Sequence, residues 1–347
     1  MGFTMAAATF PILFISPVDL REAVAASGLI RVLGEEIPGA RFTLVVPRAA
    51  APLFSGLETL DDLIVSDEAN PGRLRAELKP KVRHVPWGLT VDLRYSGVAD
   101  TVRSLRRAVL KPSRTPVHPA RAHAALFQLD PPPDPILFPY VEAEARARAL
   151  AAGEAPILAV APLTAWMGSA WPLERYSNVV MRLLGRDGPL DGGRLLVIGI
   201  GGPDPRAAEP LTRAVPRDKV IDLLHDDDLG LIAALLQRSA LYLGGDILAT
   251  QIAAAAGAPT LALFGPSDEA VAGPVASRAR IVRGPRSFEQ IAAVDRGLNQ
   301  TLSHMMDLSA DAVFEAAASL LRETRPVLAQ AEPEAASDPD PDPESAT

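Results

Sequence analysis

LYLGGDILATQIAAAAGAPTLALFGPSD, residues 241–268, predicts a strand, a sharp turn, a helix and a second strand. An apolar run ends at Gly244–Gly245, and the alanine-rich helix that follows ends at Gly257. Asp246 stands at the expected N-cap, where its carboxylate accepts backbone N–H groups of the first turn. A helix that begins at the end of a parallel strand also attracts anions to its tip. The stretch therefore predicts a parallel α/β sheet with a potential phosphate site.

The side chains at this helix tip are unusual for a phosphate site. Ile247 and Leu248 follow Asp246, where a phosphate-binding turn normally carries Gly, Ser or Thr. Their backbone N–H groups keep the capacity to bind phosphate, but the aliphatic side chains crowd the approach and supply no hydroxyl. We therefore expect the backbone scaffold of an anion site with altered side-chain chemistry.

The same alternation of strands and helices occurs on both sides of a proline-dense linker. Before the linker, apolar runs such as residues 11–15 and 40–46 alternate with helical patterns, and residues 97–110 (GVADTVRSLRRAVL) predict a helix. After it, the pattern begins again at residue 156. Alternating elements predict doubly wound parallel sheets. We expect a Rossmann-like domain over residues 1–150, a second over 151–326, and a disordered acidic, proline-rich tail over 327–347.

Composition excludes several classes of function. With 347 residues and 48% hydrophobic residues, the chain is long enough for two domains with full cores. It has no cysteine, which favours a reducing compartment, and its five histidines show no metal-ligand spacing, so no metal site is expected. The net charge of -8 falls largely on the tail, and without a strongly basic face no nucleic-acid partner is expected. The first apolar segment is too short to span a bilayer and lacks a basic flank, so we expect a cytoplasmic protein.

Several segments together resemble glycosyltransferase family 9, the heptosyltransferase family of the lipopolysaccharide core. They are IPGARFTLVV (37–46), APLTAWMGSAWPLERY (161–176), LLVIGIGGPDP (195–205) and the opening stretch, in the order and spacing of that family. The resemblance implies a GT-B fold, in which two Rossmann-like domains face each other across a cleft. It also implies inverting transfer of a sugar from a nucleotide-diphosphate donor, such as ADP-heptose, to a lipopolysaccharide or related glycolipid. Neither a metal nor another cofactor is implied.

The resemblance assigns the catalytic base to Glu22, which stands where the family has the aspartate of a Gly-Asp pair. The alternative for Glu22 is a solvated carboxylate at a helix start. The family's lysine falls on Ser169, its Ser-Gly pair on Ile247 and Leu248, and its histidine on Gln251. The implied donor-binding positions are Thr164, Ser169, Gly201, Gly202, Asp204, Asp246, Ile247, Leu248 and Gln251.

The roles of three further groups stay open at this point. Asp204 is suited either to contact the nucleotide ribose or to hold a turn before proline, and Asp246 either to serve the donor or to cap its helix. A basic cluster in the first half consists of Arg103, Arg106, Arg107, Lys111 and Arg114, and the first three are the implied acceptor-side residues. They suit an anionic glycolipid acceptor and peripheral contact with the inner membrane, or simply a solvated helix face.

The departures from the family pattern leave alternatives to sugar transfer. Simultaneous loss of the glycine, lysine, Ser-Gly and histidine removes several groups that would stabilise a departing diphosphate. A catalytically impaired GT-B relic that acts as a binding or scaffold protein is therefore the main alternative. A GT-B epimerase of nucleotide sugars is a weaker one, because acid and base residues for it are not evident.

Overall fold

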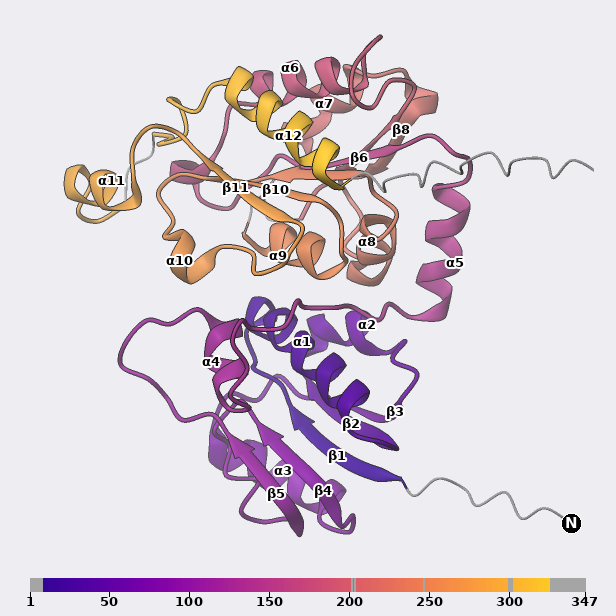
Figure 1. Ribbon diagram of the computed structural model, residues 1–347, viewed down its shortest axis with the longest axis vertical. Coiled ribbons are helices and arrows are strands. Elements are labelled where there is room, and N and C mark those ends of the chain that lie inside the picture. Colours follow the sequence, from indigo (N-terminus) through magenta and orange to yellow (C-terminus); the bar gives the residue numbers. More distant parts are fainter. Residues whose placement is uncertain (1–8, 201, 203, 246, 299–301, 325–347) are drawn as a thin grey trace, which may run out of the picture.

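The protein is described by a computed structural model that covers residues 9–200, 202, 204–245, 247–298 and 302–324. Gly201, Asp246 and the acidic tail lie outside these described residues. Two parallel sheets, each flanked by helices, form two bodies that lie one above the other in Figure 1. The predicted pair of doubly wound α/β halves is thus confirmed.

The first sheet has the strand order β3-β2-β1-β4-β5. Its central strand β1 buries Ile12, Leu13, Phe14 and Ile15 completely, as expected for a strand covered on both faces. The elements of this half are β1 (Phe10–Ile15), α1 (Leu20–Glu36), β2 (Ala40–Val46), α2 (Ala51–Phe54), β3 (Leu60–Val65), α3 (Pro71–Val82), β4 (Trp87–Asp92), β5 (Ser104–Val109) and α4 (Pro119–Ala125).

The helix expected over residues 97–110 is wrong. Residues Ser104–Val109 form β5, an edge strand parallel to β4, with Arg106 opposite Leu89. Val98 and Val102 are buried, but in the connection that precedes the strand. The exposed arginines led to the helix prediction because an edge strand, unlike a central one, can carry charged side chains. Such charges also discourage pairing of the edge with other chains.

The second sheet has the order β11-β10-β9-β6-β7-β8, with every neighbouring pair parallel. Its middle strands are buried throughout: β6, β9 and β10 contain only buried residues, of which Thr260 and Tyr242 alone carry a hydroxyl and none carries a charge. The elements are β6 (Ile157–Ala161), α6 (Leu173–Leu184), β7 (Arg194–Ile198), α7 (Glu209–Arg213), β8 (Val220–Leu223), α8 (Leu229–Leu236), β9 (Leu241–Gly244), α9 (Ile247–Ala255), β10 (Thr260–Phe264), α10 (Glu269–Ala272), β11 (Ala279–Arg283), α11 (Phe288–Val294) and α12 (Ala310–Thr324).

The two halves are joined by packed helices as well as by the linker. Helix α1 of the first half packs against α9 of the second, and one apolar cluster continues from the first sheet through these helices into the second. Helix α5 (Val141–Leu150) follows the linker and packs against α8. Its contacts include an ion pair between Glu144 and Arg238 at 2.7 Å.

None of the helices in the described ranges is both long enough and apolar enough to cross a membrane.

Candidate active site

Glu22 lies in the first turn of α1, close to the carboxyl ends of the strands in the first sheet. The side chain of Asp19 caps this helix by accepting the backbone N–H groups of Arg21 and Glu22. Burial raises the pKa of the Glu22 carboxyl above its ordinary value, and the neighbouring Asp19 raises it further, while Arg21 acts in the opposite direction. A carboxylate with a raised pKa is a stronger proton acceptor near neutral pH.

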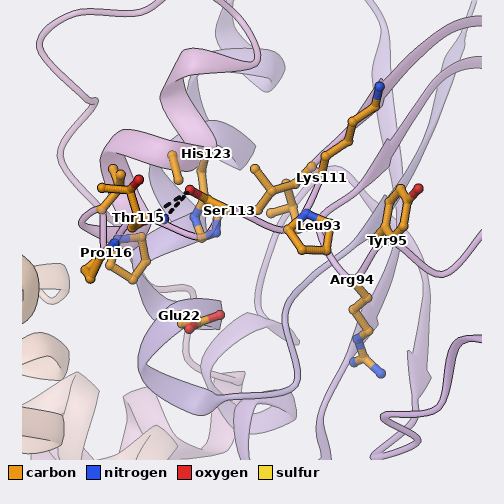
Figure 2. A pocket seen from close by; sticks show the side chains of 14 residues that line it. Glu22, Leu93, Arg94, Tyr95, Lys111, Ser113, Thr115, Pro116 and His123 are labelled. Atoms are coloured by element: carbon orange, nitrogen blue, oxygen red, sulfur yellow. Dashed lines mark hydrogen bonds between the residues drawn. The ribbon is translucent and has the colours of Figure 1, made fainter.

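A cavity of about 380 Å³ opens beside Glu22 (Figure 2). The end of β4 contributes Arg94 and Tyr95, the loop between β5 and α4 contributes Lys111, and α4 contributes His123. Polar, cationic and aromatic residues therefore line the same cavity as Glu22, which offers several polar groups to a ligand.

Two residues at the end of β4 shape one wall of this cavity. Arg94 donates hydrogen bonds from Nε to the Ser16 carbonyl at 2.6 Å and from Nη1 to the Ser66 carbonyl at 2.9 Å, which ties three strand ends together. Tyr95 has a φ of 53°, in the left-handed region that non-glycine residues rarely adopt, and is 49% exposed. Backbone strain of this kind is often found at functional sites.

A second cavity of about 200 Å³ lies between the two halves and also includes Glu22 in its lining. The first half contributes Arg21 and His118 to it, and α9 contributes Ile247 and Gln251. The structure therefore brings the residue expected to act as the base together with two of the positions expected to bind the donor. Glu22 stands at the junction of both cavities.

Hydrogen bonds to one carbonyl connect the halves at this second cavity. His118 contacts the Gly273 carbonyl through Nε2 at 2.8 Å, and Gln251 donates to the same oxygen at 3.0 Å and to that of Ala272 at 3.1 Å. Ala120 N–H donates to Nδ1 of His118, so the neutral ring carries its proton on Nε2, and burial lowers the pKa of His118. The amide nitrogen of Gln251 thus already holds the protein's own backbone.

The loop after β6 places Thr164 and Ser169 next to each other. Their hydroxyl oxygens lie 2.9 Å apart, and the Ser169 hydroxyl donates to the Trp166 carbonyl at 2.9 Å. A Cβ built on Gly245, just before α9, would lie 3.6 Å from the Ser169 carbonyl oxygen. The loop and the turn leading into α9 therefore adjoin at the carboxyl edge of the second sheet, as a shared donor site would need.

The remaining donor-side positions are arranged as follows. Ile247 lines the cavity between the halves, whereas Leu248 packs against the shared apolar cluster. A Cβ on Gly202 would lie 2.5 Å from that of Leu163, so this glycine permits close packing of two loops. Asp204 is exposed and caps a short turn by accepting the Arg206 N–H at 3.0 Å. Gly201 and Asp246 lie outside the described residues.

The three acceptor-side arginines of the basic cluster do not line the Glu22 cavity, whereas Lys111 of the same cluster does. Arg107 donates to the carbonyls of Ala99 at 2.6 Å and Val102 at 3.0 Å, and so fastens the connection before β5. Arg103 and Arg106 are exposed on or beside the edge strand. Arg106 contributes to a separate, largely apolar cavity of about 490 Å³ at the amino ends of the strands. The expected helical face of arginines is replaced by an edge strand.

Sequence reasoning missed the residues that surround Glu22. Arg94 and Tyr95 directly follow an apolar strand, a position where parallel sheets commonly carry functional side chains, and this signal was available. Lys111 was seen only as part of the basic cluster. No local pattern distinguishes His123, because its role depends on which helix face covers the cavity.

The profile of glycosyltransferase family 9 (heptosyltransferase) matches residues 93–296, which is more than half of the chain. The chain belongs to glycosyltransferase family 9. Its two-sheet architecture is the GT-B fold of that family, whose members transfer sugars. No sequence among the curated proteins matches the chain significantly.

Solved family 9 structures share the fold at low sequence identity. A family 9 glycosyltransferase from Veillonella parvula superposes with a TM-score of 0.70 at 18% identity, covering 91% of this chain and 98% of that one. The ADP-heptose lipopolysaccharide heptosyltransferase II of E. coli gives 0.67 at 17% identity, with 90% and 99% coverage. The E. coli heptosyltransferase WaaC, solved with ADP, gives 0.65 at 14% identity, with 90% and 100% coverage.

Proposed function

We propose that this family 9 protein transfers a sugar, with inversion, from a nucleotide-diphosphate sugar to a hydroxyl of a cell-surface glycolipid. Glu22 carries the proposal, because it stands where a cavity in the first half meets the cavity between the halves. An acceptor in the first cavity and a donor at the second sheet's edge would meet at this carboxylate. Its pKa, raised by burial, suits a base.

The proposed reaction moves one proton and exchanges one bond. A Glu22 carboxylate oxygen takes the proton of the acceptor hydroxyl as that oxygen attacks the anomeric carbon of the donor sugar. The bond from the anomeric carbon to the diphosphate oxygen breaks on the opposite face, and the nucleoside diphosphate leaves with the bonding electrons. Attack opposite the leaving group inverts the configuration at that carbon.

The donor is held, in this proposal, mainly by backbone. The first N–H groups of α9, at Ile247 and Leu248, would receive the diphosphate, helped by the Thr164 hydroxyl. Asp204, Gly202 and Gly201 would lie along the nucleotide. We propose ADP-heptose as donor, in line with the family resemblance and with the substrate named for the E. coli heptosyltransferase II. We expect transfer without a metal or cofactor, and undiminished activity in excess EDTA would support this.

The acceptor is proposed to be an anionic glycolipid, such as lipopolysaccharide, with Lys111 rather than the arginine cluster beside its sugar. The cluster suits a different task. Leu105 is 83% exposed on β5 between Arg103 and Arg106, a combination that favours an anionic membrane surface. We therefore place the protein in the cytoplasm, in peripheral contact with the inner membrane. Sedimentation with phosphatidylglycerol vesicles that is lost in Arg103→Glu/Arg106→Glu tests this contact.

Calorimetric titration with ADP, UDP and GDP, followed by transfer assays with the tightest binder's sugar conjugates, tests the proposed function. Binding in the micromolar to millimolar range and product of inverted configuration are expected. Absence of binding at millimolar concentration would reject it.

The alternative is a GT-B shell that binds without catalysing transfer. One observation favours it. The side chains of Ser169 and Gln251, at the positions of the family's lysine and histidine, already donate hydrogen bonds to backbone carbonyls of the protein. Nucleotide binding without any transfer, unchanged in Glu22→Gln, would support this alternative. Transfer that disappears in Glu22→Gln would exclude it.

A further inference from the structure

His118 and His123 lie five residues apart at α4 but differ in how many of their ring nitrogens form hydrogen bonds. Both are buried, with exposed fractions of 4% and 2%. His118 uses both ring nitrogens, one for Ala120 N–H and one for the Gly273 carbonyl. Nδ1 of His123 is buried and has no hydrogen-bond partner among the described residues. An unpaired buried nitrogen is costly, so its presence in a folded protein calls for a functional explanation.

The residues around His123 indicate that this function is ligand binding in the cavity beside Glu22. Its side chain lines the cavity beside Glu22, and in Figure 2 the imidazole extends from α4 towards the side of the cavity where Glu22 lies. Tyr95 and Lys111 line the same cavity from the ends of β4 and β5. A ligand in this space would therefore meet the imidazole and the carboxylate together.

The protonation state of His123 limits which ligand groups the imidazole can bind. Burial lowers the pKa of His123 to about 4, with a smaller contribution from His118, so the ring is neutral near pH 7. A neutral imidazole has one donor and one acceptor, which matches a sugar hydroxyl that both donates and accepts. It offers no positive charge to a phosphate or carboxylate.

The two groups do not compete for the same role. Burial raises the pKa of the Glu22 carboxyl above its ordinary value and lowers that of the His123 imidazole, so it strengthens the carboxylate and weakens the imidazole as a proton acceptor. His123 is thus suited to orient the acceptor while Glu22 takes the proton.

We propose that His123 is an acceptor-binding residue whose imidazole hydrogen-bonds a sugar hydroxyl close to the one that Glu22 deprotonates. The proposal rests on the proposed function and deepens it: the acceptor group in the cavity is a sugar ring with at least two hydroxyls in reach. The second hydroxyl fixes the orientation of the first. A simple alcohol should therefore be a poor acceptor.

The first test replaces His123 with leucine, which conserves much of the volume but cannot hydrogen-bond. We expect kcat/KM for the acceptor to fall about 10- to 100-fold, while the Kd for the nucleoside diphosphate stays within about twofold. The Tm should stay equal or rise by about 1–3 °C, because an unpaired buried nitrogen is removed. A residue needed only for packing would lower Tm and activity together.

Variants of the same chain provide the controls. His123→Asn and His123→Gln place an amide near the positions of Nδ1 and Nε2, so at least one should recover part of the lost kcat/KM. His84→Leu changes an exposed histidine that lines neither cavity beside Glu22 and should leave kinetics unchanged. No recovery in either amide variant would contradict a hydrogen-bonding role.

The second test needs no activity. Long-range ¹H–¹⁵N spectra of the five histidines, with His123 assigned through the leucine variant, are recorded with methyl α-D-glucopyranoside, glucuronate and ethanol as probes. We expect the sugars, and not ethanol, to shift the His123 ring nitrogens. Shifts without transfer would retain this inference and reject the proposed function. Transfer that persists in His123→Leu, with no sugar-induced shift, would reject the inference and retain the function.

Discussion

Several of the polar side chains at the carboxyl ends of the two sheets differ in whether they are already bonded to the protein. At the first sheet, Glu22, Lys111 and His123 line an open cavity, and Nδ1 of the histidine lacks a protein partner among the described residues. At the second, Ser169 and Gln251 are already bonded to the protein itself. In the proposed function, the acceptor side uses side chains, whereas the donor side uses backbone N–H groups at a helix tip.

The strongest test of this comparison removes the carboxylate. Glu22→Gln keeps the shape of the side chain but cannot accept a proton, so transfer should fall about 10²- to 10⁴-fold. Nucleoside diphosphate affinity, measured by calorimetry, should change little. The matched control is Glu35→Gln, a surface position on the same helix that pairs with Arg31.

The pH dependence of transfer supplies a second readout for Glu22. The active form is deprotonated, so kcat/KM should rise with pH through the pKa of Glu22, which burial holds above the ordinary value of a glutamate. This acidic limb should be absent from the residual activity of Glu22→Gln. A limb that persists unchanged in the variant would assign the base to another group.

Much of this arrangement could be predicted from the sequence, and the rest could not for identifiable reasons. Apolar runs ending in glycine located the strands of the second sheet, because strands buried on both faces leave a continuous apolar signal. The edge strand β5 was mistaken for a helix because its exposed arginines carry no such signal. Glu22 was named from the family resemblance, which places the family's aspartate at this position, and its role as the base stays a prediction. His123 and Tyr95 were missed, since only the fold brings α4 and the end of β4 beside α1.

Gln251 tests whether the polar side chains of the second sheet serve structure instead of the donor. If its amide serves structure, Gln251→Leu should lower the free energy of unfolding by about 1–3 kcal/mol, because two backbone carbonyls lose a buried donor. Urea denaturation measures this. Gln237→Leu is a graded control with one longer bond, 3.3 Å, and an exposed side chain, so its effect should be smaller. Unchanged stability with weakened nucleotide binding would show that Gln251 serves the donor instead.

A substitution at Ser169 tests whether an added cation at this position increases the affinity for nucleoside diphosphates. Ser169→Lys restores a cation at the position assigned to the family's lysine and sacrifices the hydrogen bond to the Trp166 carbonyl. We expect nucleoside diphosphates to bind about tenfold more tightly, or about 1.4 kcal/mol, with an affinity that falls as salt increases. Ser169→Ala, which makes the same sacrifice without the charge, should not tighten binding. Equal affinities in the two variants would mean that the diphosphate does not lie beside this loop.

Substitutions of Asp204 are expected to have the smallest effects on stability and on nucleotide binding. The carboxylate is exposed and engaged as a cap for the Arg206 N–H, so its capping role alone accounts for its position. Asp204→Ala should then cost about 0.5–1 kcal/mol of stability and weaken nucleotide binding less than about threefold. Asp204→Asn keeps an oxygen for the cap and should restore the stability. If both variants instead lower affinity about tenfold for ADP but not for inorganic diphosphate, Asp204 contacts the nucleoside, and the donor side uses at least one side chain as directly as the acceptor side does.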